Sequence, residues 1–271
     1  MKETCYFVDP TSHVFDPAHN FAAGGLAGYE RLFPVENPRA LIRLEATPTY
    51  IYQSTALSEL PDIRTEPKFI FMLREPSRQI LSTYRYFTNN WNYLKADVPF
   101  ADFIAMAAAE DSRLANNELL QHAFRNVRYA ERLEPWRARV GEARMRVLLL
   151  EDLQANRDAV MADLAAWVGL DPTFYKTYDF PRENETYQVR SHALQSLNVR
   201  VRGLIAKTPF YEGLRSAYRT LNTTASASPL TEADDAALRQ IKLACAPHNA
   251  KLASRFEIDL SAWGEEALAC P

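Results

Sequence analysis

The chain has 271 residues, of which 47% are hydrophobic and 24% are charged. That length is sufficient for a large hydrophobic core, so we expect one domain over residues 1–271. The net charge of −3 gives no sign of the generally basic surface of a nucleic-acid-binding protein, so we expect no nucleic-acid partner.

Cysteine and histidine content argues against a disulfide framework and against a metal site. The three cysteines are odd in number and lack metal-ligand spacing, and the five histidines are scattered. We expect no metal. No apolar run is long enough to span a bilayer, and the amino terminus carries no hydrophobic secretion segment. A soluble cytoplasmic protein is the expectation, and the oligomeric state is open.

In chain order, prolines and glycines over residues 9–40 predict loops and short helix, and residues 41–44 predict a strand that Pro48 ends. Residues 69–73 are an unbroken apolar run, which predicts a central parallel strand buried on both faces. Arg74 follows at its carboxyl end, and Pro76 then begins a helix.

This strand, turn and helix would place polar groups where α/β sheets bind ligands. The guanidinium of Arg74 suits a phosphate group, and Ser82 shares a helix face with Arg78. Arg74 and Ser82 could hold one phosphate between them. The alternative is that both arginines are solvated surface charges and that Ser82 is an ordinary helix residue.

The later elements are marked by periodicity and capping residues. Residues 125–136 predict an amphipathic helix with Tyr129, Leu133 and Trp136 in the core. Residues 146–153 predict a second buried strand. Residues 100–109 predict another helix, and a final helix is capped by Thr231 and is kinked or ended by Pro247.

Residues 74–87 resemble the 3′-phosphate-binding segment of sulfotransferases that use 3′-phosphoadenosine 5′-phosphosulfate (PAPS). The family pattern is Arg-x-Pro, an arginine shortly after, then Ser-x-Tyr and an aromatic residue. The resemblance implies an α/β fold of the P-loop type, a central parallel sheet flanked by helices, with PAPS as the sulfuryl donor. It also implies that Arg74 and Ser82 contact the 3′-phosphate.

Other segments support this resemblance to bacterial and heparan-sulfate-type carbohydrate sulfotransferases. Lys2-Glu3 with Phe7 is similar to their Lys-Glu-x-x-x-Phe segment, which implies that Glu3 is the general base for the acceptor hydroxyl and that Lys2 contacts the substrate. The alternative for Glu3 is an exposed terminal carboxylate. The acceptor would be a carbohydrate, a glycolipid or a natural product.

Two further stretches carry the resemblance less fully. Residues 45–50 resemble a Glu-x-Thr-Pro-x-Tyr segment, which implies that Glu45, Thr47 and Tyr50 lie near the acceptor. The alternative for Glu45 is a carboxylate that hydrogen-bonds neighbouring backbone. A later loop of these enzymes folds over the cofactor, which implies cofactor contacts for Arg190 and Ser191.

The sequence departs from the family at its phosphate loop. These enzymes carry a first strand and a Pro-Lys-x-Gly-Thr-Thr loop that cradles the 5′-phosphosulfate ahead of the Lys-Glu segment. No such pattern occurs in the 271 residues, so we expect the fold with its first strand and loop missing. Two explanations are open. One is a chain start placed too late in an otherwise normal enzyme. The other is a catalytically inactive sulfotransferase-like protein with a binding or accessory role.

Overall fold

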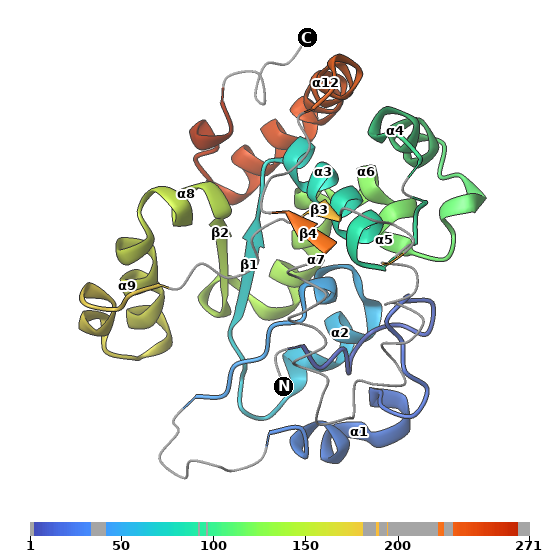
Figure 1. Ribbon diagram of the computed structural model, residues 1–271. Coiled ribbons are helices and arrows are strands. Elements are labelled where there is room, and N and C mark those ends of the chain that lie inside the picture. Colours follow the sequence, from blue (N-terminus) through green and yellow to red (C-terminus); the bar gives the residue numbers. More distant parts are fainter. Residues whose placement is uncertain are drawn as a thin grey trace. The chain divides into compact units, whose positions relative to one another are not determined.

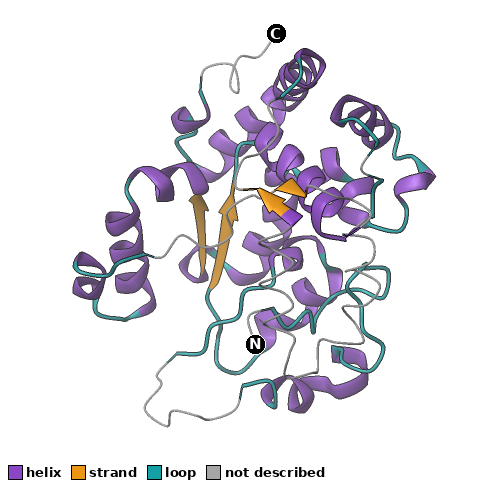
Figure 2. Cartoon of the chain, viewed as in Figure 1, coloured by secondary structure: helices purple, strands orange, loops and turns teal. Residues whose placement is uncertain are grey.

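The computed structural model describes residues 3–33, 42–91, 93–95, 97–180, 188–189, 194, 222–224 and 230–264. Helices make up most of the described chain (Figure 2). The α-helices are α1 (Phe21–Glu30), α2 (Ser54–Glu59), α3 (Pro76–Tyr86), α4 (Phe100–Ala108), α5 (Glu118–Gln121), α6 (Ala123–Asn126), α7 (Tyr129–Val140), α8 (Leu150–Ala155), α9 (Arg157–Val168) and α12 (Glu232–Phe256). The strands are β1 (Phe69–Leu73), β2 (Met145–Leu149), β3 (Gln188–Val189) and β4 (Thr223–Thr224).

The chain divides into two compact units. Of the described residues, those within 3–74, 125–160 and 246–264 belong to unit 1, and those within 75–124 and 161–245 belong to unit 2. The expected single domain stays a prediction, and each unit is described by itself below.

Unit 1 contains a small parallel sheet. Strands β1 and β2 run side by side, with Phe69 opposite Met145 and Leu73 opposite Leu149 (Figure 1). This confirms the predicted strand over residues 69–73 and the parallel sheet. Among the described residues, β2 is the one strand that pairs with β1.

The two faces of β1 differ in burial. Phe71 and Leu73 are 8% and 2% exposed, whereas Ile70 and Met72 are 36% and 44% exposed. The expectation that β1 is buried on both faces is therefore wrong. Successive side chains of a strand point to opposite faces. The buried face packs against Trp136 of α7, whose ring centroid lies 5.4 Å from that of Phe71.

Helix α7 confirms the predicted amphipathic helix, although it spans Tyr129–Val140 where the sequence predicted residues 125–136. Tyr129, Leu133 and Trp136 are each less than 5% exposed, as their spacing along one helix face requires. The indole Nε1 of Trp136 also donates a hydrogen bond to the backbone oxygen of Ile51, at 3.5 Å. Helix α7 thus contacts both β1 and the 3₁₀ helix Pro48–Tyr52 that precedes α2.

Three expectations about the boundaries of elements are wrong. Residues 42–44 form no strand, since Leu44 is 75% exposed and no third strand of the described sheet is available to bond its backbone. The predicted strand over 146–153 ends at Leu149, and α8 begins at Leu150. The expectation that Pro247 ends the last helix is wrong, because α12 continues through it to Phe256, while a kink there stays a prediction. Thr231 precedes α12 as expected and accepts from the backbone N–H of Asp234.

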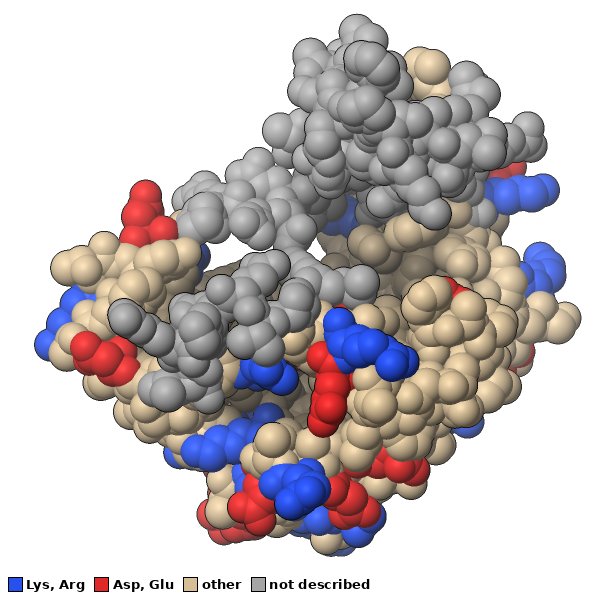
Figure 3. Space-filling model, turned by 90° about the horizontal axis from the view of Figure 1, so that it is seen from below, with Lys and Arg blue, Asp and Glu red and all other residues tan. Residues whose placement is uncertain are grey.

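The surface carries charges of both signs. On the face drawn in Figure 3, Lys and Arg side chains lie among Asp and Glu side chains over the described residues.

No helix among the described residues is both long and apolar enough to cross a membrane. The described residues also contain no group of three or more His, Cys, Asp or Glu side chains that could hold a metal ion.

Unit 2 packs α3 against α4 and α5. Tyr84 of α3 lies against Phe100 and Phe103 of α4, with ring centroids 5.2 and 5.4 Å apart, and its hydroxyl donates to the backbone oxygen of Val98 at 2.7 Å. Ile80 is 1% exposed. The helical spacing that sequence predicts from Pro76 onward is confirmed.

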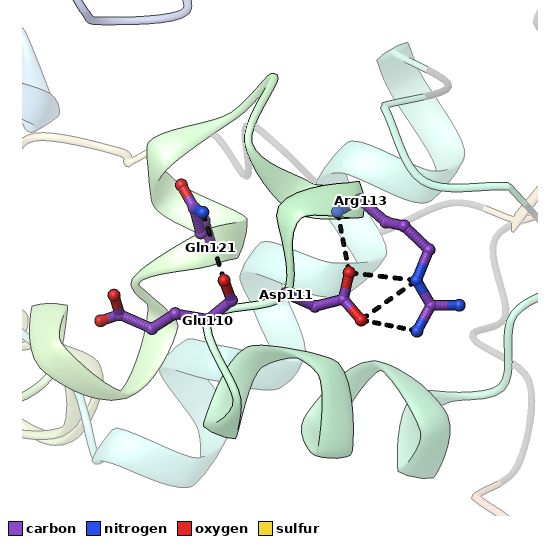
Figure 4. A network of polar contacts seen from close by, with 4 residues as sticks. All are labelled: Glu110, Asp111, Arg113 and Gln121. Carbon is purple, nitrogen blue, oxygen red and sulfur yellow. Dashed lines mark hydrogen bonds and ion pairs between the residues drawn. The ribbon is translucent and has the colours of Figure 1, made fainter.

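A polar turn connects α4 to α5 in unit 2 (Figure 4). The carboxylate of Asp111 accepts from the backbone and the guanidinium of Arg113, which lowers the pKa of Asp111 to about 2. The side-chain amide of Gln121 donates to the backbone oxygen of Glu110. These local bonds satisfy backbone groups of the turn.

The glycines of α1 make room for Tyr6 in unit 1. The Tyr6 hydroxyl donates to the backbone oxygen of Gly25 at 3.0 Å. A Cβ atom on Gly28 would stand 2.0 Å from that hydroxyl oxygen, and one on Gly24 would stand 2.2 Å from it. Such distances require the side chain of Tyr6 to move, and Tyr6 is only 3% exposed.

We therefore predict that Gly28→Ala lowers the free energy of unfolding by about 1–3 kcal/mol, the usual cost of overpacking. An alanine would otherwise favour the helix, so the sign of the change is informative. Urea denaturation measures it. In a Tyr6→Phe background the loss should be smaller, because the closest atom is gone. An equal loss in both backgrounds would contradict this packing.

Candidate functional site

The amino-terminal segment of unit 1 is held in a buried aromatic cluster. Tyr6, Phe7 and Val8 are 3%, 0% and 2% exposed. The Phe7 ring centroid lies 4.7 Å from that of Tyr29 and 5.1 Å from that of Phe21, both on α1. The segment is therefore fixed in place from Tyr6 onward, whereas the Glu3 side chain just ahead of it is exposed.

A carboxylate with three hydroxyl donors lies beside this segment. Glu45 Oε1 accepts from Thr4 Oγ1 at 2.5 Å and from Thr47 Oγ1 at 2.6 Å, and Glu45 Oε2 accepts from the Tyr29 hydroxyl at 2.7 Å. Hydrogen bonds to an ionised acceptor are short and strong. Thr4, Tyr29, Glu45, Thr47 and Tyr50 are called the Glu45 cluster below.

Tyr50 and Thr47 bond the backbone of the same segment. The Tyr50 hydroxyl oxygen accepts from the N–H groups of Tyr6 and Phe7 at 3.0 and 3.2 Å, and Thr47 Oγ1 accepts from the N–H of Cys5 at 3.2 Å. Three consecutive backbone donors are thus satisfied by two side chains of one short loop.

The direction of the remaining bond follows from counting protons. Thr4 Oγ1 lies 3.0 Å from the Tyr50 hydroxyl, and its single proton already goes to Glu45. Tyr50 must therefore donate to Thr4. Burial, followed by the nearby Glu45 charge, raises the pKa of Tyr50. Burial and the bond to Glu45 raise that of Tyr29, so both phenols stay protonated donors.

Asp9 fixes the far end of the segment to helix α2. Its carboxylate accepts from the backbone N–H groups of Ser54 and Thr55, both at 2.8 Å, and from the Thr55 hydroxyl at 2.7 Å. The Asp9 N–H donates to the Gln53 side chain. Burial opposes ionisation of Asp9, but these hydrogen bonds outweigh it and lower the pKa of Asp9.

Arg74 follows β1 directly, as the sequence predicts. Its side chain is half-buried, and its backbone oxygen accepts from the Tyr129 hydroxyl at 2.9 Å. This bond connects the carboxyl end of β1 to the first residue of α7. The backbone that carries the guanidinium is therefore held at a defined place in unit 1.

Glu75 caps the amino terminus of α3 in unit 2. It is 3% exposed, and its carboxylate accepts from the backbone N–H groups of Ser77 and Arg78, both at 3.0 Å, and from the Ser77 hydroxyl at 2.6 Å. Ser82 lies one turn after Arg78 on α3 and is half-buried. Arg74 closes unit 1 and Ser82 belongs to unit 2.

The other residues singled out from sequence divide into two groups. Glu45, Thr47 and Tyr50 are brought together, and their polar groups bond the protein itself. Lys2, Arg190 and Ser191 lie outside the described residues. The sequence did not predict the hydrogen bonds of Thr4 and Asp9, because their partners are more than 40 residues away. It also did not predict that Glu75 caps α3, although its position just before a helix-starting proline was a usable signal.

We predict that Asp9→Asn lowers the free energy of unfolding by about 1 kcal/mol at neutral pH, the typical cost of a lost helix cap. Because the pKa of Asp9 is lowered in the folded state, its stabilisation is full above the unfolded pKa of about 3.9 and is lost as the pH falls through the folded pKa. Urea unfolding at pH 7 and at pH 3 measures this. The difference in stability between the two proteins should be smaller at the lower pH.

Asp163→Asn is the matched control, because Asp163 is exposed on α9. It should leave stability within about 0.5 kcal/mol. A constant gap between Asp9→Asn and the wild type across this pH range would contradict the role of the Asp9 charge.

Comparison with known proteins identifies the fold. A scan against protein-family models and a search of the curated proteins return no match to this chain. Among solved structures, the chain is similar to a sulfotransferase from Alicyclobacillus acidocaldarius, with a TM-score of 0.62 and 19% sequence identity. The match covers 97% of this chain and 86% of that one. The chain therefore has the fold of that sulfotransferase.

Proposed function

We propose that this protein transfers a sulfuryl group from PAPS to a hydroxyl of a carbohydrate, glycolipid or natural-product acceptor. The observation that carries the proposal is the sequence of residues 74–87, which follows strand β1 and resembles the 3′-phosphate-binding segment of PAPS sulfotransferases. The likeness of the whole fold to a sulfotransferase supports it independently.

In this proposal, Arg74 and Ser82 bind the 3′-phosphate. The first backbone N–H groups of α3, those of Ser77 and Arg78, are already bonded by Glu75. A phosphate beside this turn would therefore depend on side-chain donors rather than on the helix terminus. The guanidinium of Arg74 is suited to that task, since it offers two parallel N–H groups to phosphate oxygens.

Glu3 would act as the general base. Its exposed carboxylate is open to an acceptor, and the segment behind it is anchored by the Glu45 cluster. PAPS supplies the sulfuryl group. Glu3 would take the proton of the acceptor hydroxyl while the acceptor oxygen bonds to sulfur and 3′-phosphoadenosine 5′-phosphate departs. Acceptor contacts by Lys2, Glu45, Thr47 and Tyr50, and cofactor contacts by Arg190 and Ser191, stay predictions.

The second candidate is a nucleotide-binding protein that transfers no sulfate. It is favoured by one observation: the resemblance of residues 74–87 concerns the 3′-phosphate of the nucleotide, and not the transfer of the sulfuryl group. This candidate keeps the roles of Arg74 and Ser82 and removes that of Glu3.

We predict that the 271-residue chain binds 3′-phosphoadenosine 5′-phosphate with micromolar affinity in a calorimetric titration. Arg74→Ala should weaken binding roughly 10- to 100-fold, because the loss of a hydrogen bond between charged groups lowers affinity by about this factor. Adenosine 5′-phosphate, which lacks the 3′-phosphate, should bind equally weakly to both proteins.

Arg113→Ala is the matched control, because Arg113 is an exposed arginine paired with Asp111 in unit 2. It should leave the affinity unchanged. A folded wild-type chain that does not distinguish the two nucleotides would overturn the phosphate site and with it both candidates. Nucleotide binding without turnover of PAPS would select the second candidate.

A further inference from the structure

The loop of residues 45–50 bonds four consecutive residues of the amino-terminal segment. Thr4 donates its hydroxyl proton to Glu45, the Cys5 N–H donates to Thr47, and the next two N–H groups donate to Tyr50. An irregular segment of this kind needs such partners, because buried backbone donors are costly when unpaired. The loop therefore determines the path of the chain at residues 4–7.

The side-chain polar groups of Glu45, Thr47 and Tyr50 all form hydrogen bonds within the protein. Glu45 receives three hydroxyl protons, and the Tyr50 hydroxyl accepts two backbone N–H groups while donating to Thr4. A carboxylate with its oxygens so engaged offers little to a substrate. Glu3, one residue before Thr4, is by contrast exposed.

The backbone at Cys5 shows how firmly the segment is constrained. Its φ angle is 49°, in the left-handed region that residues other than glycine rarely adopt. Such a conformation persists only where surrounding contacts impose it. Here the Cys5 N–H is bonded to Thr47, and the hydroxyl of the preceding Thr4 is bonded to Glu45.

We propose that Glu45, Thr47 and Tyr50 are positioning residues, which fix residues 4–7 and thereby orient the Glu3 carboxylate. This role replaces the acceptor contacts that the sequence predicts for these three residues. The effect on sulfuryl transfer rests on the proposed function, whereas the anchoring of the segment does not. A general base acts only when it is held within hydrogen-bond reach of the proton that it takes.

Hydrogen exchange of the full-length chain tests the anchoring. The variants Tyr50→Phe and Tyr29→Phe each lose one phenolic hydroxyl and keep the ring, but only Tyr50 bonds the backbone of the segment. The amides of Tyr6 and Phe7 should exchange at least about tenfold faster in Tyr50→Phe than in Tyr29→Phe. The β1 amides report whether either variant unfolds globally. Equal rates at Tyr6 and Phe7 in the two variants would overturn the proposal.

A second pair of variants covers the case in which Tyr50→Phe does not fold. Thr4→Val removes the hydroxyl that bonds Glu45, and Thr4→Ser keeps it. Faster exchange at Tyr6 and Phe7 in Thr4→Val, restored by Thr4→Ser, supports anchoring through Glu45. Equal exchange rates at Tyr6 and Phe7 in the wild type, Thr4→Val and Thr4→Ser would contradict it.

Turnover of PAPS with a p-nitrophenyl glycoside as the acceptor probe tests the positioning. Thr4→Val should lower kcat by roughly tenfold or more while leaving KM for PAPS unchanged, and Thr4→Ser should restore kcat. An unchanged kcat alongside faster exchange would overturn the positioning role. A wild type that neither binds nor turns over nucleotide would refute the proposed function, and the exchange data would then decide the anchoring alone.

Discussion

The rest of the described site depends on the hydrogen bonds that the ionised carboxylate of Glu45 accepts. It brings together three parts of unit 1 that are distant in sequence: Thr4 of the amino-terminal segment, Tyr29 of α1 and Thr47 of its own loop. Each bond is charge-assisted, and each hydroxyl would lose a strong acceptor if the carboxylate were removed. One side chain thereby determines how these segments are arranged around Tyr6 and Phe7.

The same segment is fixed by two further contacts of different kinds. Tyr6 fits against α1 only because Gly24 and Gly28 carry no Cβ, and Asp9 takes up the free N–H groups at the start of α2. Close packing, a helix cap and the half-buried Glu45 carboxylate therefore act along one stretch of six residues, 4–9. Such redundancy is expected where a chain segment has no strand partner to satisfy its backbone.

Sequence predicted the elements whose signals are local. The apolar run of β1, the helix-starting Pro76 and the spacing of Tyr129, Leu133 and Trp136 were enough to place β1, α3 and α7. The sequence did not predict burial correctly where burial depends on neighbouring elements. An apolar run does not show how many faces of a strand are covered, and Ile70 and Met72 of β1 are exposed.

The candidate site shows the same division between local and long-range signals. The segments with Glu3, Glu45 and Arg74 were found by their resemblance to sulfotransferases. The bond from Thr4 to Glu45, across 41 positions, follows from no local pattern.

The measurement that tests the central role of Glu45 most directly is a double-mutant cycle between Thr4→Val and Glu45→Gln, followed by urea unfolding. If the Glu45 carboxylate holds the segment through Thr4, the two losses are not additive, and the coupling energy is about 1 kcal/mol or more. Additive losses, with a coupling energy near zero, would contradict the account.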